Sequence, residues 1–386
     1  MAKAKRKKTN MDWKPVAAGL LILPLVYGTA KGTLPYLQPA LERAALWSAG
    51  LSFQTQLPEE EARSQTVNQS SIEFLAQHDA GDWNSLPEDP YEELPLKESS
   101  PKEPEEGETA LPPDPPEEKP ANAGTILRKS YQAGTTGIYI PVGKGSLKNC
   151  TSLSAAEIQQ VIAQKPAFEI QQDLDTPEVL IMHTHATEGY QSRARDWFDP
   201  ASTSRTTDCS QNTCRVGDEI EKQLLAAGIG VLHDRTLHDY PSYNGAYERS
   251  AATVKGYLEQ YPSIKVVLDV HRDAIQPDAE TMVAPVAEIN GKSSAQVMII
   301  SGCDNGSFNM PNYRENLKFS AALQRQMAED YPGLARPILF DYRKYNQDLT
   351  TGSILLEMGG HGNTLEEAVY CGELVGKSLA KVLSSL

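Results

Sequence analysis

The chain has 386 residues, of which 36 are Lys or Arg and 51 are Asp or Glu, so its formal net charge is −15. This balance argues against a nucleic-acid-binding protein, since neutralising phosphates requires a basic face. Five cysteines are too few and too scattered for a disulfide scaffold of this size. At ~150 residues per domain, the length allows about two domains, or one larger domain with tails.

The N-terminal residues 1–14 contain six Lys or Arg and one Asp, and residues 15–30 carry no charge. A membrane-spanning helix needs about 20 apolar residues, which the chain reaches if Lys31 snorkels and the span extends outward. We therefore predict a cytoplasmic tail at 1–14 and a single-pass transmembrane anchor at 15–37, with the rest of the chain outside the cell membrane. The alternative is a cleaved signal peptide that ends at 28–30 (Gly-Thr-Ala).

Residues 82–120 are acidic and rich in proline, with thirteen acidic residues, three basic residues and ten prolines. Proline removes backbone donors and like charges repel, so this segment cannot bury enough surface to fold. We predict that residues 38–124 form a juxtamembrane region and a disordered spacer, which holds the following domain away from the membrane. Residues 125–386 then form a single domain.

The pattern of residues 125–386 predicts an α/β domain with a mixed, mostly parallel central sheet flanked by helices. Short apolar runs predict buried strands at 178–182, 266–270 and 354–356, and a helix followed by a strand at 216–232. Asn290-Gly291 predicts a hairpin between 282–289 and 295–301. Helical spacing extends over 312–331 and 363–383, with Asn363 and Glu366 in the capping positions of the second helix.

Residues that can bind a metal follow three of the predicted strands, at the edge of the sheet where sites form in α/β proteins. His183, His185 and Glu188 follow the first strand, His271 follows the second, and Glu357 and His361 come at the third. Two imidazoles and a carboxylate hold zinc and leave one position open. In an extended chain the side chains of His183 and His185 point to the same face. Once the chain bends into a loop, they no longer need to point the same way. We therefore predict His183, Glu188 and His271 as ligands, with His185 supporting them or facing substrate.

Glu357 lies within an apolar run, where burial raises the pKa of a carboxyl group. A pKa near neutrality suits a general base that activates water, so we predict Glu357 as the catalytic residue. The alternative is a structural salt bridge with Arg272. Polar residues near strand ends can anchor a polar substrate, and the candidates for this role are Arg272, Asn346, Gln347 and Asp348.

Cys209 and Cys214 lie five residues apart in a polar loop and could form a disulfide beside this site. A second metal site at these cysteines lacks further ligands nearby.

Six segments of the chain resemble the stage II sporulation protein P family, the membrane-anchored cell-wall hydrolases of endospore formers. They are HTHATEGY, SRTTDCSQNTCRVGDE, AYERSAATV, LDVHRDA, YPGLARPI and YNQDLTTGSILLEMGGHGNTLEEA. The family is similar to zinc-dependent N-acetylmuramoyl-L-alanine amidases, which implies one Zn²⁺ held by His183, Glu188 and His271, with Glu357 as the catalytic carboxylate. The amidases have Gly-His-Gly at the first ligand where this chain has His-Thr-His, so His185 remains a candidate for it.

The resemblance implies cleavage of the amide between N-acetylmuramic acid and L-alanine, and endopeptidase activity on stem-peptide cross-links. It also implies action at the forespore septum, in septal wall remodelling and engulfment. The partners that it implies are peptidoglycan, a sporulation lytic transglycosylase and an integral membrane protein. The alternatives are a non-catalytic peptidoglycan-binding tether and a zinc exopeptidase on the same fold. The carboxylate of Glu357 beside the ligands favours catalysis, because a binding protein has no need of a base.

Overall fold

The computed structural model describes residues 118–386. The predicted tail at 1–14, the anchor at 15–37 and most of the spacer lie outside these residues. Among residues 118–386 no helix is both long and apolar enough to cross a membrane. This finding runs against the predicted location in the cell membrane, which we do not retain.

The main sheet has eight strands in the order β2-β3-β11-β10-β12-β7-β4-β6. Among the described residues, five of its seven neighbouring pairs are parallel, so the predicted mixed, mostly parallel sheet is confirmed. In chain order its strands are β2 (Tyr139–Val142), β3 (Gly145–Asn149), β4 (Val179–Met182), β6 (Val231–His233), β7 (Val266–Asp273), β10 (Val297–Gly302), β11 (Ile338–Asp341) and β12 (Gly352–Gly360).

A smaller sheet has the order β5-β1-β8-β9. Its strands are β1 (Gly124–Lys129), β5 (Trp197–Phe198), β8 (Thr281–Ile289) and β9 (Lys292–Ala295). Asn290 and Gly291 join β8 to β9 with φ values of 52° and 74°, the positive angles that a tight hairpin turn requires. The predicted hairpin is therefore confirmed, but its second strand is β9 alone. The apolar residues of β10 are buried on both faces, so this strand lies inside the main sheet between β11 and β12.

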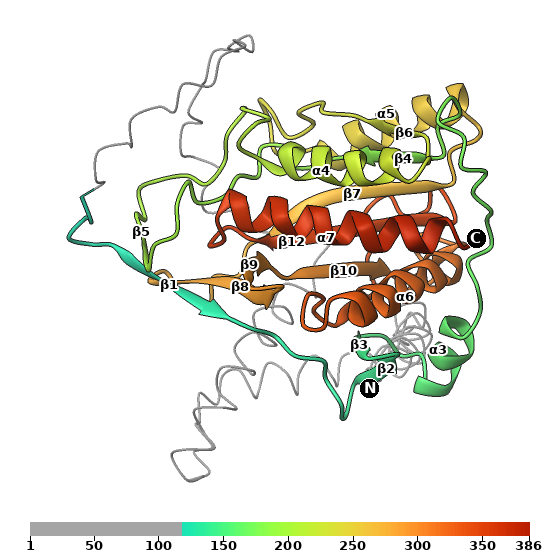
Figure 1. Cartoon of the computed structure of the whole chain (residues 1–386), viewed down its shortest axis with the longest axis horizontal. Coiled ribbons are helices and arrows are strands. Elements are labelled where there is room, and N and C mark those ends of the chain that lie inside the picture. The colour runs from blue at the N-terminus through green and yellow to red at the C-terminus, as the bar shows by residue number, and fades with distance from the viewer. Residues whose placement is uncertain (1–117) are drawn as a thin grey trace, which may run out of the picture. The chain divides into compact units, whose positions relative to one another are not determined.

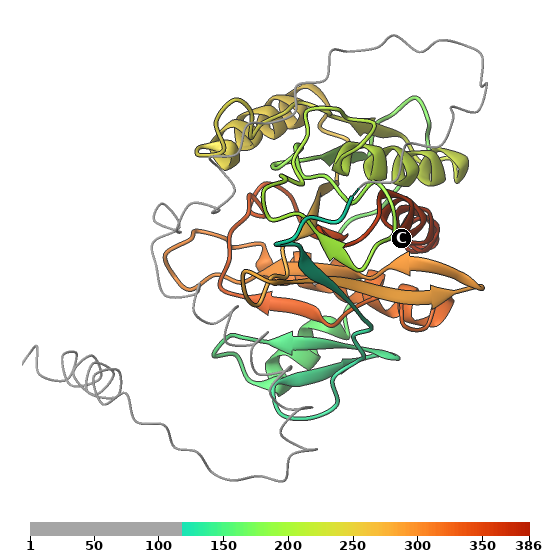
Figure 2. The same ribbon diagram turned by 90° about the vertical axis from the view of Figure 1, so that its left-hand side faces the viewer.

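Helices cover both faces of the main sheet. Figure 1 shows α4 (Thr213–Ala226), α7 (Leu365–Leu383) and α6 (Tyr313–Asp330) side by side on one face, with α7 in the middle. The short helix α3 (Ala155–Ile162) lies beside α6, and α5 (Ala246–Gln260) packs on the opposite face. The turned view in Figure 2 shows the same layers from the side. Helix α7 begins one residue later than predicted, because Thr364 and Glu367 form its capping box.

Strand β4 shows why the central strands read as unbroken apolar runs. Val179 and Ile181 belong to the large core beneath α4, α6 and α7, whereas Leu180 and Met182 pack with Val254 of α5. A strand with a helix layer on each face has no side that faces water, so period-two alternation disappears. The same burial fixes the carboxyl ends of β4, β7 and β12 next to one another.

Gly217 allows α4 to lie close to the end of β4. A Cβ at this position would lie 2.6 Å from His233 Nε2 and 3.0 Å from His183 Cε1. Helix propensity alone predicts that Gly217→Ala stabilises the protein by about 1 kcal/mol. We expect instead a loss of about 1–3 kcal/mol in the free energy of unfolding, because the methyl group overpacks the contact. Urea unfolding measures this difference.

Gly256 in α5 is the matched control, since a Cβ there meets nothing within 4 Å. Gly256→Ala is expected to stabilise the protein by about 0.5–1 kcal/mol. If both alanine variants are stabilised alike, α4 is not held against the two imidazole rings.

Candidate metal centre

Three parallel neighbouring strands build the site, because β7 pairs with β4 on one side and with β12 on the other. The loop after β4 carries His183, His185 and Glu188. His271 belongs to β7, which continues to Asp273 and so is longer than predicted. Glu357 belongs to β12 and lies in register with His271. Residues far apart in the sequence thus meet at one edge of the sheet.

His185, Glu188 and His271 converge at this edge. Their potential ligand atoms all lie within 4.8 Å of one another. His185 Nδ1 lies 3.7 Å from Glu188 Oε1, and His271 Nδ1 lies 3.5 Å from Glu188 Oε2. All three side chains are buried. The backbone N–H of Arg272 also donates to Glu188 Oε2 at 3.0 Å, which fixes the direction of the carboxylate.

Glu188 supplies the negative charge that a divalent cation needs in this group, whereas His271 would have to release a proton before it could bind one. Burial opposes the charge of Glu188, but hydrogen bonds from His185 and His271 hold the pKa of its carboxyl well below the usual range. Burial lowers the pKa of His185, so its imidazole is neutral at pH 7. Burial also opposes charge on His271, yet the carboxylates of Asp269 and Glu188 raise its pKa well above the usual range. Two imidazole nitrogens around an ionised carboxylate are a donor set that zinc accepts.

His183 lies outside this group. Its Nδ1 lies 2.8 Å from the carbonyl oxygen of Val270, and its Nε2 lies 2.8 Å from His233 Nε2. Both ring nitrogens therefore have partners inside the protein. The chain turns directly after β4, so His183 points toward α4 while His185 points to Glu188. The structure thus groups His185, and not the predicted His183, with Glu188 and His271, and which of the two histidines binds a metal stays a prediction.

Glu357 is partly buried, and its Oε2 has no hydrogen-bond partner among the described residues. Burial, followed by the nearby charge of Asp273, raises the pKa of its carboxyl to about 8. The alternative salt bridge with Arg272 is not formed, since that guanidinium donates to Gly189 O and Ser204 Oγ. A general base needs a carboxylate oxygen that is not already paired, and Glu357 Oε2 meets this requirement beside the metal-binding group.

The predicted substrate-binding residues are engaged within the protein. Asn346 donates to the carbonyl oxygen of Tyr247, and Asp348 pairs with Lys344 at 3.0 Å. Gln347 is 1% exposed and bonds to the backbone on β10. Arg272 is buried beneath the loop after β4. The contacts of these four residues give no support to the substrate-binding role, which stays a prediction.

Asp269 is a residue of the site that the sequence reasoning missed. Its Oδ1 lies 2.8 Å from His271 Nε2, and its two oxygens accept hydrogen bonds from the backbone and hydroxyl of Thr184 at 2.8 and 2.7 Å. The signal for it was a carboxylate two positions before a predicted ligand on a strand, which places both side chains on one face. Tyr243 was also missed; its ring stacks on His185 with centroids 4.5 Å apart.

A second group of potential ligands consists of Asp218, Glu221 and His233. Arg235 already pairs with both of its carboxylates, because its guanidinium lies 2.6 Å from Asp218 Oδ1 and 2.9 Å from Glu221 Oε2. This pairing offsets one of the two negative charges and occupies one oxygen of each carboxylate. We therefore assign no metal to this group.

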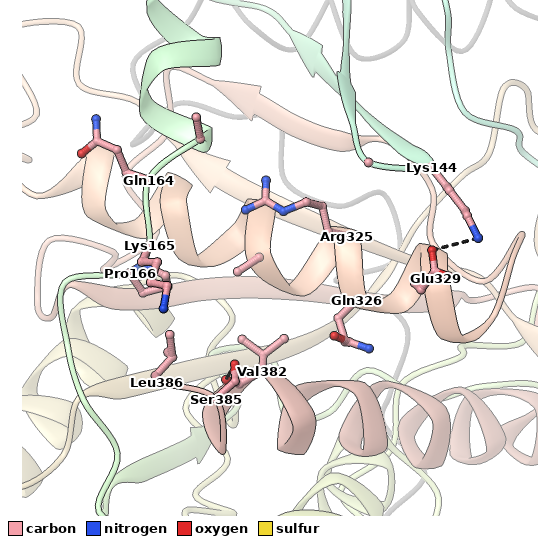
Figure 3. A pocket seen from close by; sticks show the side chains of 13 residues that line it. Lys144, Gln164, Lys165, Pro166, Arg325, Gln326, Glu329, Val382, Ser385 and Leu386 are labelled. Carbon is pink, nitrogen blue, oxygen red and sulfur yellow. Dashed lines mark hydrogen bonds and ion pairs between the residues drawn. The ribbon is translucent and has the colours of Figure 1, made fainter.

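A cavity of about 560 Å³ lies away from the candidate metal centre and shares no residue with it (Figure 3). Its lining comes from the turn after β2, the end of α3, one side of α6 and the last residues of the chain. Lys144 and Glu329 form an ion pair across its rim at 2.8 Å.

The fold and this site together define an α/β protein with a candidate His–Glu–His metal centre beside an unpaired carboxylate. The chain belongs to the Stage II sporulation protein P family, which matches residues 63–384. Stage II sporulation protein P of Bacillus subtilis (strain 168) is 32% identical over 206 residues. That match covers 50% of this chain and 48% of the relative, so the chain spans about half the length of the curated relative it matches.

Solved structures similar in fold include several N-acetylmuramoyl-L-alanine amidases. AmiC2 of Nostoc punctiforme is 11% identical with a TM-score of 0.32, and the match covers 54% of this chain and 96% of AmiC2. The CwlD amidase from Clostridioides difficile, solved in complex with the GerS lipoprotein, is 10% identical with a TM-score of 0.32, covering 54% and 100%. Ami1 from Mycobacterium smegmatis is 14% identical with a TM-score of 0.31, covering 55% and 100%. The catalytic argument below rests on this chain's own residues.

Proposed function

We propose that the protein is a zinc-dependent peptidoglycan hydrolase that cleaves the amide between N-acetylmuramic acid and L-alanine. The observation that carries this proposal is the convergence of His185, Glu188 and His271 next to the open oxygen of Glu357. When bound by these three residues, zinc would polarise the scissile carbonyl and make water a stronger nucleophile.

Side chains of the protein transfer the proton and orient the ligands. Glu357 accepts a proton from the attacking water and donates it to the leaving amine, which would otherwise depart as an unstable anion. Its pKa of about 8 lets the same group hold a proton near neutral pH. Tyr243 stacks on His185 and limits the rotation of that ring.

Asp269 positions His271 by contacting Nε2, so that Nδ1 faces Glu188. Outer partners of this kind fix the orientation of a ligating imidazole. Asp269→Asn is therefore expected to weaken zinc binding about 10- to 100-fold. Competition with a chromophoric chelator measures the affinity without relying on activity.

Asp341→Asn is the control for this substitution, because the carboxylate of Asp341, the last residue of β11, is buried but binds Arg343 two residues further along the chain. We expect its zinc affinity to match that of the unchanged protein. Equal zinc affinities in the unchanged protein and both variants would show that Asp269 does not position His271 for zinc binding.

Endopeptidase activity on stem-peptide cross-links is a second activity that we propose for the same site. Family membership supports a role in sporulation. We propose that this role is septal wall remodelling and engulfment, with peptidoglycan as substrate and with a lytic transglycosylase and an integral membrane protein as partners. The open carboxylate of Glu357 favours catalysis over a non-catalytic tether.

Mass spectrometry of the products formed by the purified chain from intact peptidoglycan tests these activities together. Free stem peptides that begin with L-alanine support amide cleavage, and uncrosslinked muropeptides support the endopeptidase. Release of single amino acids instead would indicate an exopeptidase. Binding to peptidoglycan without any product would indicate a tether.

A further inference from the structure

Three tyrosine side chains adjoin His185 in a continuous row, and the proposed function uses only the first of them. The ring centroid of His185 lies 4.5 Å from that of Tyr243 and 5.5 Å from that of Tyr247. The ring of Tyr345 continues the row, with its centroid 5.3 Å from that of Tyr247. All three tyrosines are partly exposed. Tyr243, Tyr247 and Tyr345 thus form an aromatic row that leads away from the candidate metal centre.

The turn after β11 carries the far end of the aromatic row in a strained conformation. Tyr345 and Asn346 have φ values of 45° and 54°, in the left-handed region that residues other than glycine rarely adopt. Such a conformation costs free energy and persists only where the surrounding structure imposes it, and it is concentrated at binding and catalytic sites. The strain therefore marks this turn as a candidate binding element.

Three hydrogen bonds impose the conformation of this turn. The side-chain amide of Asn346 donates to the carbonyl oxygen of Tyr247 at 2.8 Å and to Ser250 Oγ at 3.0 Å, which ties the turn to α5. Arg343 Nη1 donates to the hydroxyl of Tyr345 at 2.8 Å. The rings are therefore in place before a ligand arrives, so little side-chain entropy is lost on binding.

Two arginines flank the aromatic row, and each of them is paired with an aspartate. The guanidinium of Arg205 lies 4.8 Å from the ring centroid of Tyr243 and contacts Asp239 Oδ2 at 3.0 Å. Arg343 Nε contacts Asp341 Oδ2 at 3.0 Å. Because each aspartate offsets one positive charge, the aromatic row presents ring surface and hydroxyl groups in surroundings of balanced charge.

This chemistry distinguishes the two halves of the proposed substrate. The amide that we propose as the scissile bond joins a sugar to a peptide, so the sugar and the peptide leave the metal centre in different directions. Stem peptides carry free carboxylates, which bind best to unpaired cations. A pyranose ring has apolar C–H faces and neutral polar groups, which suit amphipathic tyrosine side chains.

We propose that Tyr247 and Tyr345 bind a sugar ring of the peptidoglycan glycan strand, while Tyr243 stays stacked on His185. The inference rests on the proposed function for its choice of substrate. It adds the half of the substrate that these two residues recognise.

Binding of an N-acetylglucosamine tetramer to the full chain tests this assignment, since the tetramer has sugar rings but neither a stem peptide nor the scissile amide. We expect the NMR signals of the Tyr247 and Tyr345 rings to shift during a titration in the presence of a metal chelator. Tyr345→Leu removes the flat ring and should weaken binding about 2- to 10-fold, the share that aromatic geometry adds beyond buried area. Tyr345→Phe keeps the ring and should bind the tetramer as the unchanged chain does.

Tyr342→Leu is the matched control, because Tyr342 is also partly exposed but its hydroxyl lies 2.6 Å from Ser152 Oγ, outside the aromatic row. Equal affinities of Tyr345→Leu and Tyr342→Leu would overturn the proposal. So would a titration that leaves the signals of both rings unchanged, a result that does not depend on whether Tyr345→Leu folds.

The same measurements separate this inference from the proposed function. Binding of the tetramer through Tyr247 and Tyr345 without any hydrolysis product supports the sugar site and refutes only the hydrolase. Hydrolysis of peptidoglycan by a chain that does not bind the tetramer refutes the sugar site alone.

Discussion

Glu357→Gln is expected to reduce release of stem peptides from peptidoglycan by about 10²- to 10⁴-fold, the range in which general acid–base groups contribute. Glutamine keeps the shape of the side chain but can neither accept the proton from water nor return it to the leaving amine. The position is suited to this exchange, because Glu357 Oε2 has no partner among the described residues and no salt bridge depends on it.

The same variant should bind zinc as tightly as the unchanged protein, since Glu357 does not belong to the converging group. Its stability should be preserved or slightly increased, because burial of an ionisable carboxyl is costly and the amide removes that cost. Turnover by mass spectrometry, zinc content and urea unfolding measure the three quantities. A variant that hydrolyses at the normal rate excludes Glu357 as the base. A variant that loses zinc assigns it to the metal instead.

The strand ends that carry the site were predictable from sequence, whereas the choice between neighbouring histidines was not. The apolar run of β4 places a strand end at Met182 because a strand buried on both faces has no polar alternation. The path of the next residues depends on distant groups. Asp269 binds Thr184, and Asp239 binds the backbone and hydroxyl of Thr187. These contacts bend the loop so that His185, and not His183, reaches Glu188.

The hairpin likewise depends partly on neighbouring residues and partly on residues far along the chain. Asn290-Gly291 requires positive φ angles that few other pairs adopt easily, so the turn follows from two residues. The position at which β9 ends does not follow from these two residues, because β10 leaves the hairpin to pair with β12 more than fifty residues later. Asp269 is a different case. Its contact with His271, two residues further along the same strand, follows from strand periodicity and was a local signal that the sequence reasoning did not use.

His185→Ala is expected to weaken zinc binding more than about 100-fold, beyond the effect of losing an outer partner of a ligand. The substitution removes one of only two imidazoles in the converging group and leaves Glu188 and His271 to hold the ion. Activity should fall with zinc content. Inductively coupled plasma mass spectrometry of the purified chain, together with a chelator competition, gives occupancy and affinity.

His183→Asn is the matched comparison two residues away. Asparagine can still donate to the carbonyl oxygen of Val270, although it loses the contact with His233. We expect a loss of about 1–3 kcal/mol in the free energy of unfolding, since a buried polar partner is left unsatisfied. Zinc binding should remain near normal, because neither nitrogen of His183 faces Glu188. The opposite pattern, with zinc lost from His183→Asn and kept by His185→Ala, would show that the loop after β4 turns the other histidine to the metal.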